Sequence, residues 1–433
     1  MPSRPPDVSR CTNRKNDRSP NLRGLTVKPV TEQLALISRG VEQIETRDSL
    51  RQKLEGSRTS GKPLRVKYGI DPTGIDVHLG HTVPLRKLRL FQDLGHQAVL
   101  IIGNYTALVG DPSGRDQTRA HLTQEQVEAN ARDYLKQVSK VIDIGKTEVH
   151  ANGDWFSRFR FLDVVDLAKK ITMQRMLERD DFTKRIKEAK PIYLHECLYA
   201  LMQGHDSVEI KADIELGGSE QLFSLMVARD LQRDAGQEPQ VCITLPILRG
   251  LDGERRMGKS LNNYVGVGES AYDMFANVMS LPDTLMKDWF ELLTDRTVDE
   301  IDQLTDDTKT HPRRAKEMLG TDIVQFYHGA EAAREAAAEW TRRFSQGNDP
   351  KEIPAIVIAA SELTQGKMGI CKLLARLGLV QSTNEARRLL GPNSGVTIGP
   401  NREKITDPTA QVQVVNDLIV RVGNRRIARV RLV

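Results

Sequence analysis

Apolar and polar residues alternate in the first regular element that the sequence predicts. From Leu64 to Ile70 every second residue is apolar or aromatic, and Arg65, Lys67 and Gly69 lie between them, which predicts a β-strand. The next residues, 71–74, read D-P-T-G, a sequence typical of a turn. Apolar residues then recur at helical spacing from 83 to 94, and 99–102 form a short apolar run like that of a buried parallel strand. The pattern predicts a strand–helix–strand unit whose first turn faces a nucleotide-binding crevice.

The patterns along the rest of the chain divide it into further segments. A length of 433 residues indicates two or three domains at about 150 residues each. We expect an α/β fold, with a Rossmann-like parallel sheet and a connective insertion at 31–280. A charged segment without strand runs predicts a small helical domain at 281–346, and a Gly-Asn-Asp-Pro stretch begins a linker at 347–366. A small α+β module follows at 367–433, in which Ser382 and Glu385 have the spacing of a capping box.

Residues 1–30 have the composition of a basic extension. They are polar and rich in arginine and proline, without an apolar stretch, which predicts disorder. A transit peptide is an alternative that Asp7 and Asp17 interrupt, and a translation start placed too far upstream would also give such a segment.

Charge and cysteine content exclude several classes of protein. The net charge is +5, and basic residues far outnumber acidic ones beyond Lys367, which predicts a surface that faces phosphates. The four cysteines are scattered, with no C-x-x-C pair, so we expect neither structural zinc nor a disulfide framework, and we expect a reducing cytoplasm. No apolar run approaches the roughly 18 residues of a membrane span, so we expect no membrane partner.

Two separated motifs are suited to binding a nucleotide triphosphate. His78, Gly80 and His81 lie at the predicted start of the helix, where free backbone N–H groups and the helix dipole favour phosphate. Far downstream, 256–260 read R-M-G-K-S. Gly253, Gly258, Lys259 and Ser260 also fit the spacing of a Walker loop, but a polar turn separates them from the preceding apolar run, and the intervening Glu254 to Arg256 are poor phosphate-nest formers.

A third group of residues is suited to binding an amino acid. Tyr199, Gln203 and Asp206 are spaced four and three residues apart, so one face of a helix presents all three. Asp111 lies in G-D-P-S-G, and 217–221 read G-G-S-E-Q. An ammonium group needs acceptors and negative charge, and a phenol is distinguished from a phenyl ring only by a buried polar partner.

These motifs resemble those of class I aminoacyl-tRNA synthetases, H-I-G-H and K-M-S-K-S, and the whole set resembles bacterial tyrosyl-tRNA synthetases from about Leu34 to the C-terminus. The resemblance implies that Tyr199, Gln203 and Asp111 hold the substrate ammonium group and that Asp206 binds the phenol hydroxyl. It places Gln221 near the reacting carboxylate. By strand alternation Lys67 shares a face with Asp71, and we expect both to line the same substrate pocket. It assigns the following to ATP binding: Gly80, Gly218, Glu220, Arg256, Met257 and Ser260.

Three departures from the family pattern affect these roles. Lys67 stands where many members carry a second tyrosine that binds the phenol, and Tyr68, one residue on, points to the other face of the strand. Glu220 replaces an aspartate near the ribose. Arg256 and Gly258 replace the first lysine and the first serine of K-M-S-K-S, which keeps the charge in a planar form and adds flexibility.

The function that the resemblance implies is a cytoplasmic tyrosine–tRNA ligase. Tyrosine would attack ATP, with Mg²⁺ accompanying the nucleotide and no structural metal in the protein, and the product would be transferred to tRNA(Tyr). The residues implied to stabilise the reacting phosphate are His78, His81, Lys259, Thr73, Arg115 and Arg119.

The resemblance also concerns the RNA partner and the assembly. The helical domain corresponds to the family's anticodon-side domain, and N-E-A-R-R-L-L at 384–390 resembles an RNA-binding module of ribosomal-protein type, in which Arg387 and Arg388 would contact tRNA. A homodimer is implied. Two alternatives stay open: an idle RNA-binding paralogue, against which His78, His81 and Lys259 argue, and a related enzyme that activates another amino acid.

Overall fold

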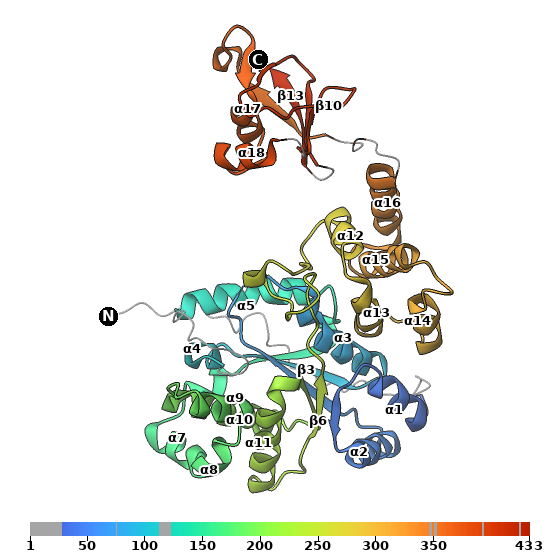
Figure 1. Cartoon of the computed structure of the whole chain (residues 1–433). Coiled ribbons are helices and arrows are strands. Elements are labelled where there is room, and N and C mark those ends of the chain that lie inside the picture. The colour runs from blue at the N-terminus through green and yellow to red at the C-terminus, as the bar shows by residue number, and fades with distance from the viewer. Residues whose placement is uncertain are drawn as a thin grey trace. The chain divides into compact units, whose positions relative to one another are not determined.

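A six-stranded sheet, seen in the computed structural model of the chain, forms the centre of the first part of the protein (Figure 1). The structure describes residues 28–74, 76–111, 123–345, 349, 353–391, 394–423 and 426–433. The strands are β1 (Gln43–Glu45), β2 (Arg65–Ile70), β3 (Gln97–Ile102), β4 (Thr147–Ala151), β5 (Ile214–Gly218) and β6 (Val241–Leu245). Their order is β1-β6-β5-β2-β3-β4, and only β1 is antiparallel to its neighbour.

The strand order reverses between β2 and β5. From β2 the chain proceeds outward to β3 and β4, and it then returns to β5 and β6 on the other side of β2. In open parallel sheets of this kind, ligands bind outside the carboxyl ends of the strands at such a switch point. The α/β class with a Rossmann-like sheet is therefore confirmed. A ligand-binding site is expected at the switch point between β2 and β5.

Helices connect the strands and cover the sheet. They are α1 (Val30–Ser38), α2 (Arg47–Ser60), α3 (Leu79–Asp93), α4 (Thr106–Val109), α5 (Gln124–Val138), α10 (Leu194–Glu209) and α11 (Leu222–Asp234). The predicted strand–helix–strand unit is β2-α3-β3. Helix α3 turns Leu79, Leu85, Leu88 and Phe91, all fully buried, toward the core, as helical spacing requires. It ends before Gly95, whose φ of 89° favours glycine.

The connective insertion lies between β4 and α10. It contains four short helices, α6 (Gly153–Phe156), α7 (Phe161–Ala168), α8 (Met173–Met176) and α9 (Asp180–Lys187). Leu167, Met176 and Phe182 of this insertion are buried together with Leu201 and Leu231 from α10 and α11. The insertion is therefore packed onto the sheet domain through an apolar cluster of its own.

A run of helices follows the sheet. It comprises α12 (Ala271–Met279), α13 (Met286–Leu293), α14 (Val298–Thr305), α15 (Pro312–His328) and α16 (Ala330–Trp340), and the last continues into a π-helical turn at Thr341–Ser345. Trp289 and Phe290 of α13 are fully buried. Among the described residues, no helix is both long enough and apolar enough to cross a membrane.

The C-terminal segment forms a separate small fold. It contains β7 (Ala355–Ile358), β8 (Lys367–Gly369), α17 (Ile370–Arg376), α18 (Thr383–Leu389), β9 (Val396–Ile398), β10 (Glu403–Lys404), β11 (Gln411–Gln413), β12 (Ile419–Val422) and β13 (Arg426–Leu432). Five strands form a sheet in the order β10-β9-β12-β13-β7, and β8 pairs with β11. The side chain of Ser382 accepts from the Glu385 N–H at 3.2 Å, as an N-cap does.

The predicted linker at 347–366 needs correction. Strand β7 lies within it and pairs in parallel with β13, and the Ile358 side chain is fully buried in the C-terminal core. Asp349 forms ion pairs with Arg402 and Arg421 of the same fold. The C-terminal fold therefore begins near Asp349, because the pairing that recruits this segment comes from the far end of the chain.

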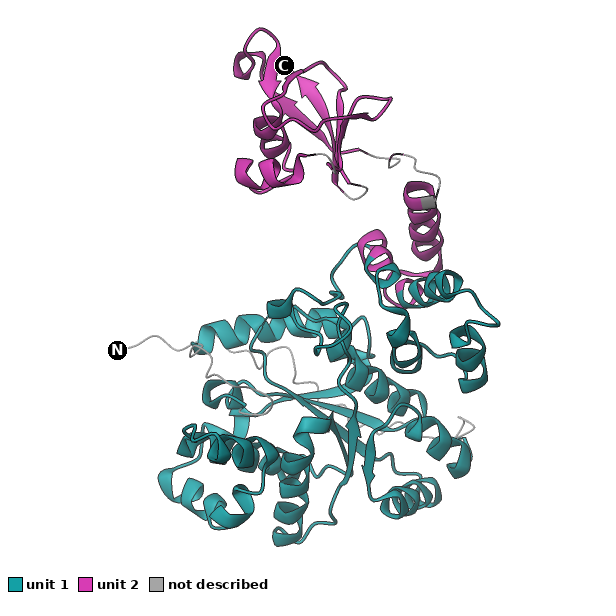
Figure 2. Cartoon of the chain, viewed as in Figure 1, with its two compact units in different colours: residues 1–270, 277–323 teal, residues 271–276, 324–433 magenta. Residues whose placement is uncertain are grey.

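The chain divides into two compact units (Figure 2). One comprises residues 1–270 and 277–323, and it contains the six-stranded sheet. The other comprises residues 271–276 and 324–433, and it contains the C-terminal fold. The division passes through α12 and α15, so the helical run is shared between the units.

Candidate active site

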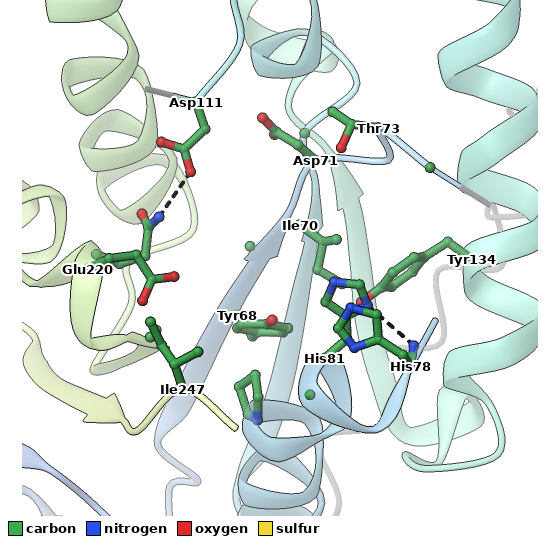
Figure 3. Close-up of a pocket in the computed structure, with 18 of the residues that line it drawn as sticks. Tyr68, Ile70, Asp71, Thr73, His78, His81, Asp111, Tyr134, Glu220 and Ile247 are labelled. Atoms are coloured by element: carbon green, nitrogen blue, oxygen red, sulfur yellow. Dashed lines mark hydrogen bonds between the residues drawn. The ribbon is translucent and has the colours of Figure 1, made fainter. Parts of the chain in front are cut away.

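A pocket of about 1270 Å³ opens at the carboxyl ends of the central strands, at the switch point between β2 and β5 (Figure 3). Its walls come from β2 and the turn after it, the start of α3, one face of α10, the G-G-S-E-Q stretch and the R-M-G-K-S loop. All of these lie in the first unit. The fold thus brings together segments that are far apart in the sequence.

At one end of the pocket, Tyr199 and Asp71 form a fixed pair. The Tyr199 hydroxyl donates to Oδ2 of Asp71 at 3.0 Å, and the Thr106 hydroxyl donates to Oδ1 at 2.7 Å. A Cβ atom at Gly103 would lie only 2.0 Å from Oδ1 of Asp71 and 2.3 Å from Oγ1 of Thr106, so the Asp71 side chain occupies space that only glycine leaves open. Burial, together with the Asp71 charge, raises the pKa of Tyr199 well above its usual value, and its hydroxyl stays protonated.

Asp206 is a buried carboxyl group on the same face of α10. Trp155 Nε1 donates to Oδ1 at 3.0 Å, and Asn152 Nδ2 donates to Oδ2 at 3.3 Å. Burial raises the pKa of Asp206 to about 7, against the opposing effects of the Lys67 charge and of these two hydrogen bonds. The Asp206 carboxyl group is therefore a neutral hydrogen-bond acceptor below neutral pH and a charged one above it.

Two further predicted residues meet beside the Asp71 pair. Gln221 Nε2 donates to Oδ2 of Asp111 at 2.9 Å, and the dashed line that ends at Asp111 in Figure 3 marks this contact. Gln203 also lines the pocket, and its Oε1 is buried without a hydrogen-bond partner among the described residues. The pocket thus presents carboxylates and an acceptor to any group that carries only donors, such as an ammonium.

The two histidines stack at the start of α3. Their ring centroids are 3.7 Å apart and the planes differ by 17°, and the His78 backbone N–H donates to Nδ1 of His81 at 3.4 Å. Burial, and secondarily His81, lowers the pKa of His78 to about 3. His78 is therefore a neutral hydrogen-bond donor at physiological pH, and it would stabilise a phosphate without carrying a net charge.

The R-M-G-K-S loop contacts this histidine turn directly. The Gly80 N–H donates to Sδ of the buried Met257 at 3.4 Å. Backbone bonds from Leu79 to Val265 at 2.9 Å and from Val267 to Val77 at 2.8 Å join the histidine turn to the segment that follows this loop. The two motifs that the sequence predicts to bind phosphate therefore border one space.

The lysine of this loop lies in a short 3₁₀ turn, Lys259–Leu261. Its ammonium group pairs with Asp76 at the surface, and the Gly258 N–H donates to Oδ1 of the buried Asn263 at 2.9 Å. Walker loops instead join a strand directly to an α-helix, so the Walker interpretation of Gly253 to Ser260 does not describe this site.

Comparison with known proteins assigns the chain to a family. The family model described as tRNA synthetases class I (W and Y) matches residues 59–345. The chain belongs to this family. The tyrosine–tRNA ligase of Symbiobacterium thermophilum is 47% identical over 406 residues, which cover 93% of this chain and 98% of that protein. The tyrosine–tRNA ligase of Aquifex aeolicus is 47% identical over 399 residues, covering 92% of this chain and 98% of that protein.

A solved structure shows the same fold at lower identity. The C-terminally truncated mitochondrial tyrosyl-tRNA synthetase of Aspergillus nidulans superposes with a TM-score of 0.60 at 20% identity, over 75% of this chain and 96% of that one. The resemblance to bacterial tyrosyl-tRNA synthetases that the motifs indicated is confirmed by the identity to the bacterial relatives.

Most residues that the sequence singled out for this class I synthetase line the one pocket. They are Lys67, Asp71, Thr73, His78, Gly80, His81, Asp111, Tyr199, Gln203, Asp206, Gly218, Glu220, Gln221, Arg256, Met257, Lys259 and Ser260. Arg115 and Arg119 lie outside the described residues. Arg387 and Arg388 lie on α18 in the other unit, with exposed side chains.

Sequence reasoning missed the residues that hold these side chains in place. Thr106 bonds Asp71, whereas Asn152 and Trp155 bond Asp206. A signal was present for Asn152, a polar residue that directly follows β4 as Asp71 directly follows the parallel strand β2. Lys67 forms an ion pair with Glu215 of β5, which the sequence did not single out.

Proposed function

We propose that the protein is a tyrosine–tRNA ligase, which activates L-tyrosine with ATP to tyrosyl-adenylate and pyrophosphate and then transfers tyrosine to the 3′-terminal adenosine of tRNA(Tyr). Family membership and 47% identity to proteins named tyrosine–tRNA ligase support it. The observation that carries it is the single pocket in which the histidine turn and the lysine loop border Tyr199, Gln203 and Asp206. One end offers donors to phosphate, and the other offers acceptors to an amino acid.

The chemistry of adenylate formation needs no general base, because the tyrosine carboxylate is already a nucleophile. The side chains instead hold the two substrates in line and stabilise charge on the phosphate that is transferred. Neutral His78 donates a hydrogen bond there together with His81, and Lys259 adds positive charge once it leaves Asp76. Thr73 lies in the turn after β2, beside the space where pyrophosphate would depart. Mg²⁺ enters as part of MgATP, since it binds mainly through substrate phosphates and water.

Recognition of tyrosine rests on two groups of side chains. Tyr199, Gln203 and Asp111 hold the ammonium group, and Asp71, which accepts from the Tyr199 hydroxyl, lies beside them. Gln221 lies near the reacting carboxylate. Asp206 accepts the phenol hydroxyl. A phenylalanine side chain would leave this buried acceptor without its donor, which is the physical basis for rejecting it.

The RNA partner is assigned to the later segments of the chain. The exposed Arg387 and Arg388 of α18 are proposed to contact tRNA phosphates, and the helical run corresponds to the family's anticodon-side domain. Phosphate contacts release counterions, so replacing both arginines by alanine is expected to reduce the salt dependence of tRNA binding. Binding measured between low and moderate salt tests this assignment.

A homodimer is supported by the surface of the connective insertion. Large apolar side chains are exposed there, among them Phe161 at 80%, Leu162 at 70% and Met173 at 56%. Exposed apolar side chains gathered in one segment are typical of an interface. Light scattering of the wild type and of Phe161→Asp would test it, with the dimer expected to weaken in the variant. We place the enzyme in the cytoplasm.

The decisive test is amino-acid-dependent exchange of pyrophosphate into ATP. We expect exchange with tyrosine far above that with any other amino acid, and charging of tRNA(Tyr) in the second step. An idle paralogue would show no exchange with any amino acid, and a synthetase of other specificity would show its largest rate elsewhere.

A further inference from the structure

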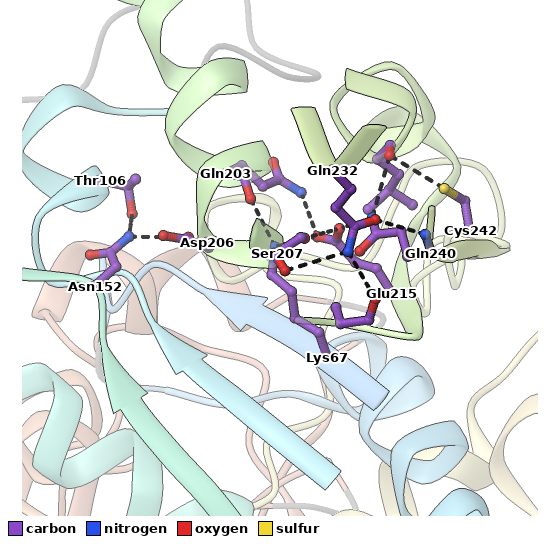
Figure 4. Close-up of polar contacts among 12 residues, drawn as sticks. Lys67, Thr106, Asn152, Gln203, Asp206, Ser207, Glu215, Gln232, Gln240 and Cys242 are labelled. Atoms are coloured by element: carbon purple, nitrogen blue, oxygen red, sulfur yellow. Dashed lines mark hydrogen bonds and ion pairs between the residues drawn. The ribbon is translucent and has the colours of Figure 1, made fainter. Parts of the chain in front are cut away.

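A connected set of mostly buried polar groups lies beside the tyrosine-binding face of α10 (Figure 4). Lys67 of β2 is fully buried, and its ammonium group has three partners. It donates to the main-chain oxygen of Gln203 at 2.8 Å and to Oγ of Ser207 at 2.7 Å, and it pairs with Oε1 of Glu215 at 2.9 Å. Lys67 and Glu215 are direct neighbours in the register of β2 and β5. Each ammonium proton therefore has an acceptor.

The Glu215 carboxylate is equally well satisfied. Oε1, which pairs with Lys67, also accepts from Nε2 of Gln203 at 3.3 Å. Oε2 accepts from Oγ of Ser207 at 2.9 Å and from Nε2 of Gln240. Such a pair is poor evidence for stability, because apolar residues of similar volume often replace buried ion pairs without loss. The network therefore calls for another explanation than stability.

The side-chain amide of Gln203 supplies that explanation. An amide has a donor end and an acceptor end, and the two are exchanged by a half-turn about a soft torsion. Glu215 occupies the donor end. The acceptor end, Oε1, is left buried and without a partner among the described residues, on a side chain that lines the pocket. An ammonium group can bond to this oxygen, but it cannot bond to the NH₂ end.

We propose that Glu215, held by Lys67, is a positioning residue for the amino-acid substrate, because it fixes the Gln203 amide with Oε1 available to the substrate ammonium group. This role rests on the proposed function and deepens it. Lys67 acts twice, since it fixes Glu215 and holds the main-chain oxygen of Gln203. Lys67 also opposes the effect of burial on the pKa of Asp206. This one buried cation therefore acts on the ammonium end of the substrate through Gln203 and on the phenol end through Asp206.

The test compares variants of the full-length enzyme that differ in what residue 215 offers to Gln203. In Lys67→Met/Glu215→Met both charges are removed and the acceptor is lost. In Glu215→Gln, Lys67 directs the amide oxygen toward itself, since an ammonium accepts no hydrogen bonds, and the acceptor for Gln203 is kept. We expect the KM for tyrosine in pyrophosphate exchange to rise about tenfold or more in the first variant, the size of losing one hydrogen bond to a charged group. Glu215→Gln should stay near the wild type, and neither should change the KM for ATP.

Two further variants separate positioning from general damage. Gln240→Leu removes a donor to the other oxygen of Glu215, so it should lower the melting temperature and leave the KM for tyrosine unchanged. In a Gln203→Leu background the Lys67/Glu215 replacement should have no additional effect on this KM, because its target is gone. If the double replacement does not fold, Lys67→Met/Glu215→Gln is tested in its place. Its KM for tyrosine should exceed that of Glu215→Gln.

The inference is overturned if the folded double replacement binds tyrosine like the wild type. It is also overturned if the rise in KM persists in the Gln203→Leu background, or if Gln240→Leu raises KM equally. A wild-type enzyme without tyrosine-dependent exchange would instead refute the proposed function, so the two failures are distinguishable.

Discussion

The selectivity of the enzyme for tyrosine over phenylalanine should rise with pH through neutrality, because Asp206 titrates there. Burial raises its pKa to about 7. Below that pH the carboxyl group is protonated, and the phenol hydroxyl of tyrosine meets a neutral acceptor. Above it the acceptor is charged, and hydrogen bonds to charged groups are stronger than neutral ones by about 1 kcal/mol. Tyrosine activation should therefore gain roughly three- to fourfold in kcat/KM between pH 6 and pH 8, out of a limit of about fivefold, and phenylalanine activation should not.

Stability should respond to pH in the opposite sense. The native-state pKa of Asp206 lies above the usual value of 3.8, so between these two values the native state holds a proton that the unfolded state has lost. Stability therefore falls as pH rises across this window. About three pH units at about 1.4 kcal/mol each give an upper figure of about 4 kcal/mol. Asp206→Asn has no such proton to lose.

The assay compares the wild type with Asp206→Asn from pH 4 to pH 8. Urea unfolding gives the unfolding free energy of each protein. As pH rises over this range, the unfolding free energy of the wild type should fall relative to that of the variant by up to about 4 kcal/mol. Using the difference cancels the constant effect of the Asn amide on Trp155 and Asn152. Pyrophosphate exchange is measured with tyrosine and with phenylalanine from pH 6 to pH 8. The ratio of the two kcat/KM values, tyrosine over phenylalanine, should rise with pH in the wild type and stay flat in the variant. A flat wild-type ratio, or a rise that survives in Asp206→Asn, would refute the assignment of Asp206 to the phenol.

Local patterns predicted the parts of the site that lie close together in sequence. The turn at 71–74, the histidines at the helix start and the helical face of Tyr199, Gln203 and Asp206 follow from spacing within one element. The outline of the pocket could be predicted because parallel strands end at one edge of a sheet, where successive turns meet.

Contacts between distant elements could not be predicted in the same way. Glu215 meets Lys67 because β5 lies next to β2, and no spacing rule gives that strand order. Trp155 and Asn152 reach Asp206 from the end of β4, across the sheet. The linker prediction was wrong for the same reason, since β7 is recruited by β13 at the end of the chain. In all three, the contact is made between elements that are far apart in the sequence.

Three further predictions test separate parts of the structure. His78→Ala should slow adenylate formation by about 2–4 kcal/mol in barrier height, with little change in the KM for tyrosine; equal losses in both would place His78 in tyrosine binding instead. Gly103→Ala should raise the KM for tyrosine, because the new Cβ would lie 2.0 Å from Oδ1 of Asp71, whereas Gly56→Ala, on α2 with no atom within 4 Å of the added Cβ, should leave the KM unchanged and add about 0.5–1 kcal/mol of stability. The last concerns where the C-terminal fold begins. A chain that ends at Asn348 removes Asp349 and β7 together with their partners, so it should stay soluble and keep near-normal tyrosine activation while tRNA charging is lost. A chain that ends at Gly366 retains β7 without β13, and it thereby exposes Ile358, which is fully buried in the whole protein. An unpaired apolar edge strand promotes aggregation, so this longer chain should be the less soluble of the two. Equal solubility in a sedimentation assay would show that β7 does not depend on the C-terminal sheet, and loss of activation in the shorter chain would make the C-terminal fold part of the catalytic core.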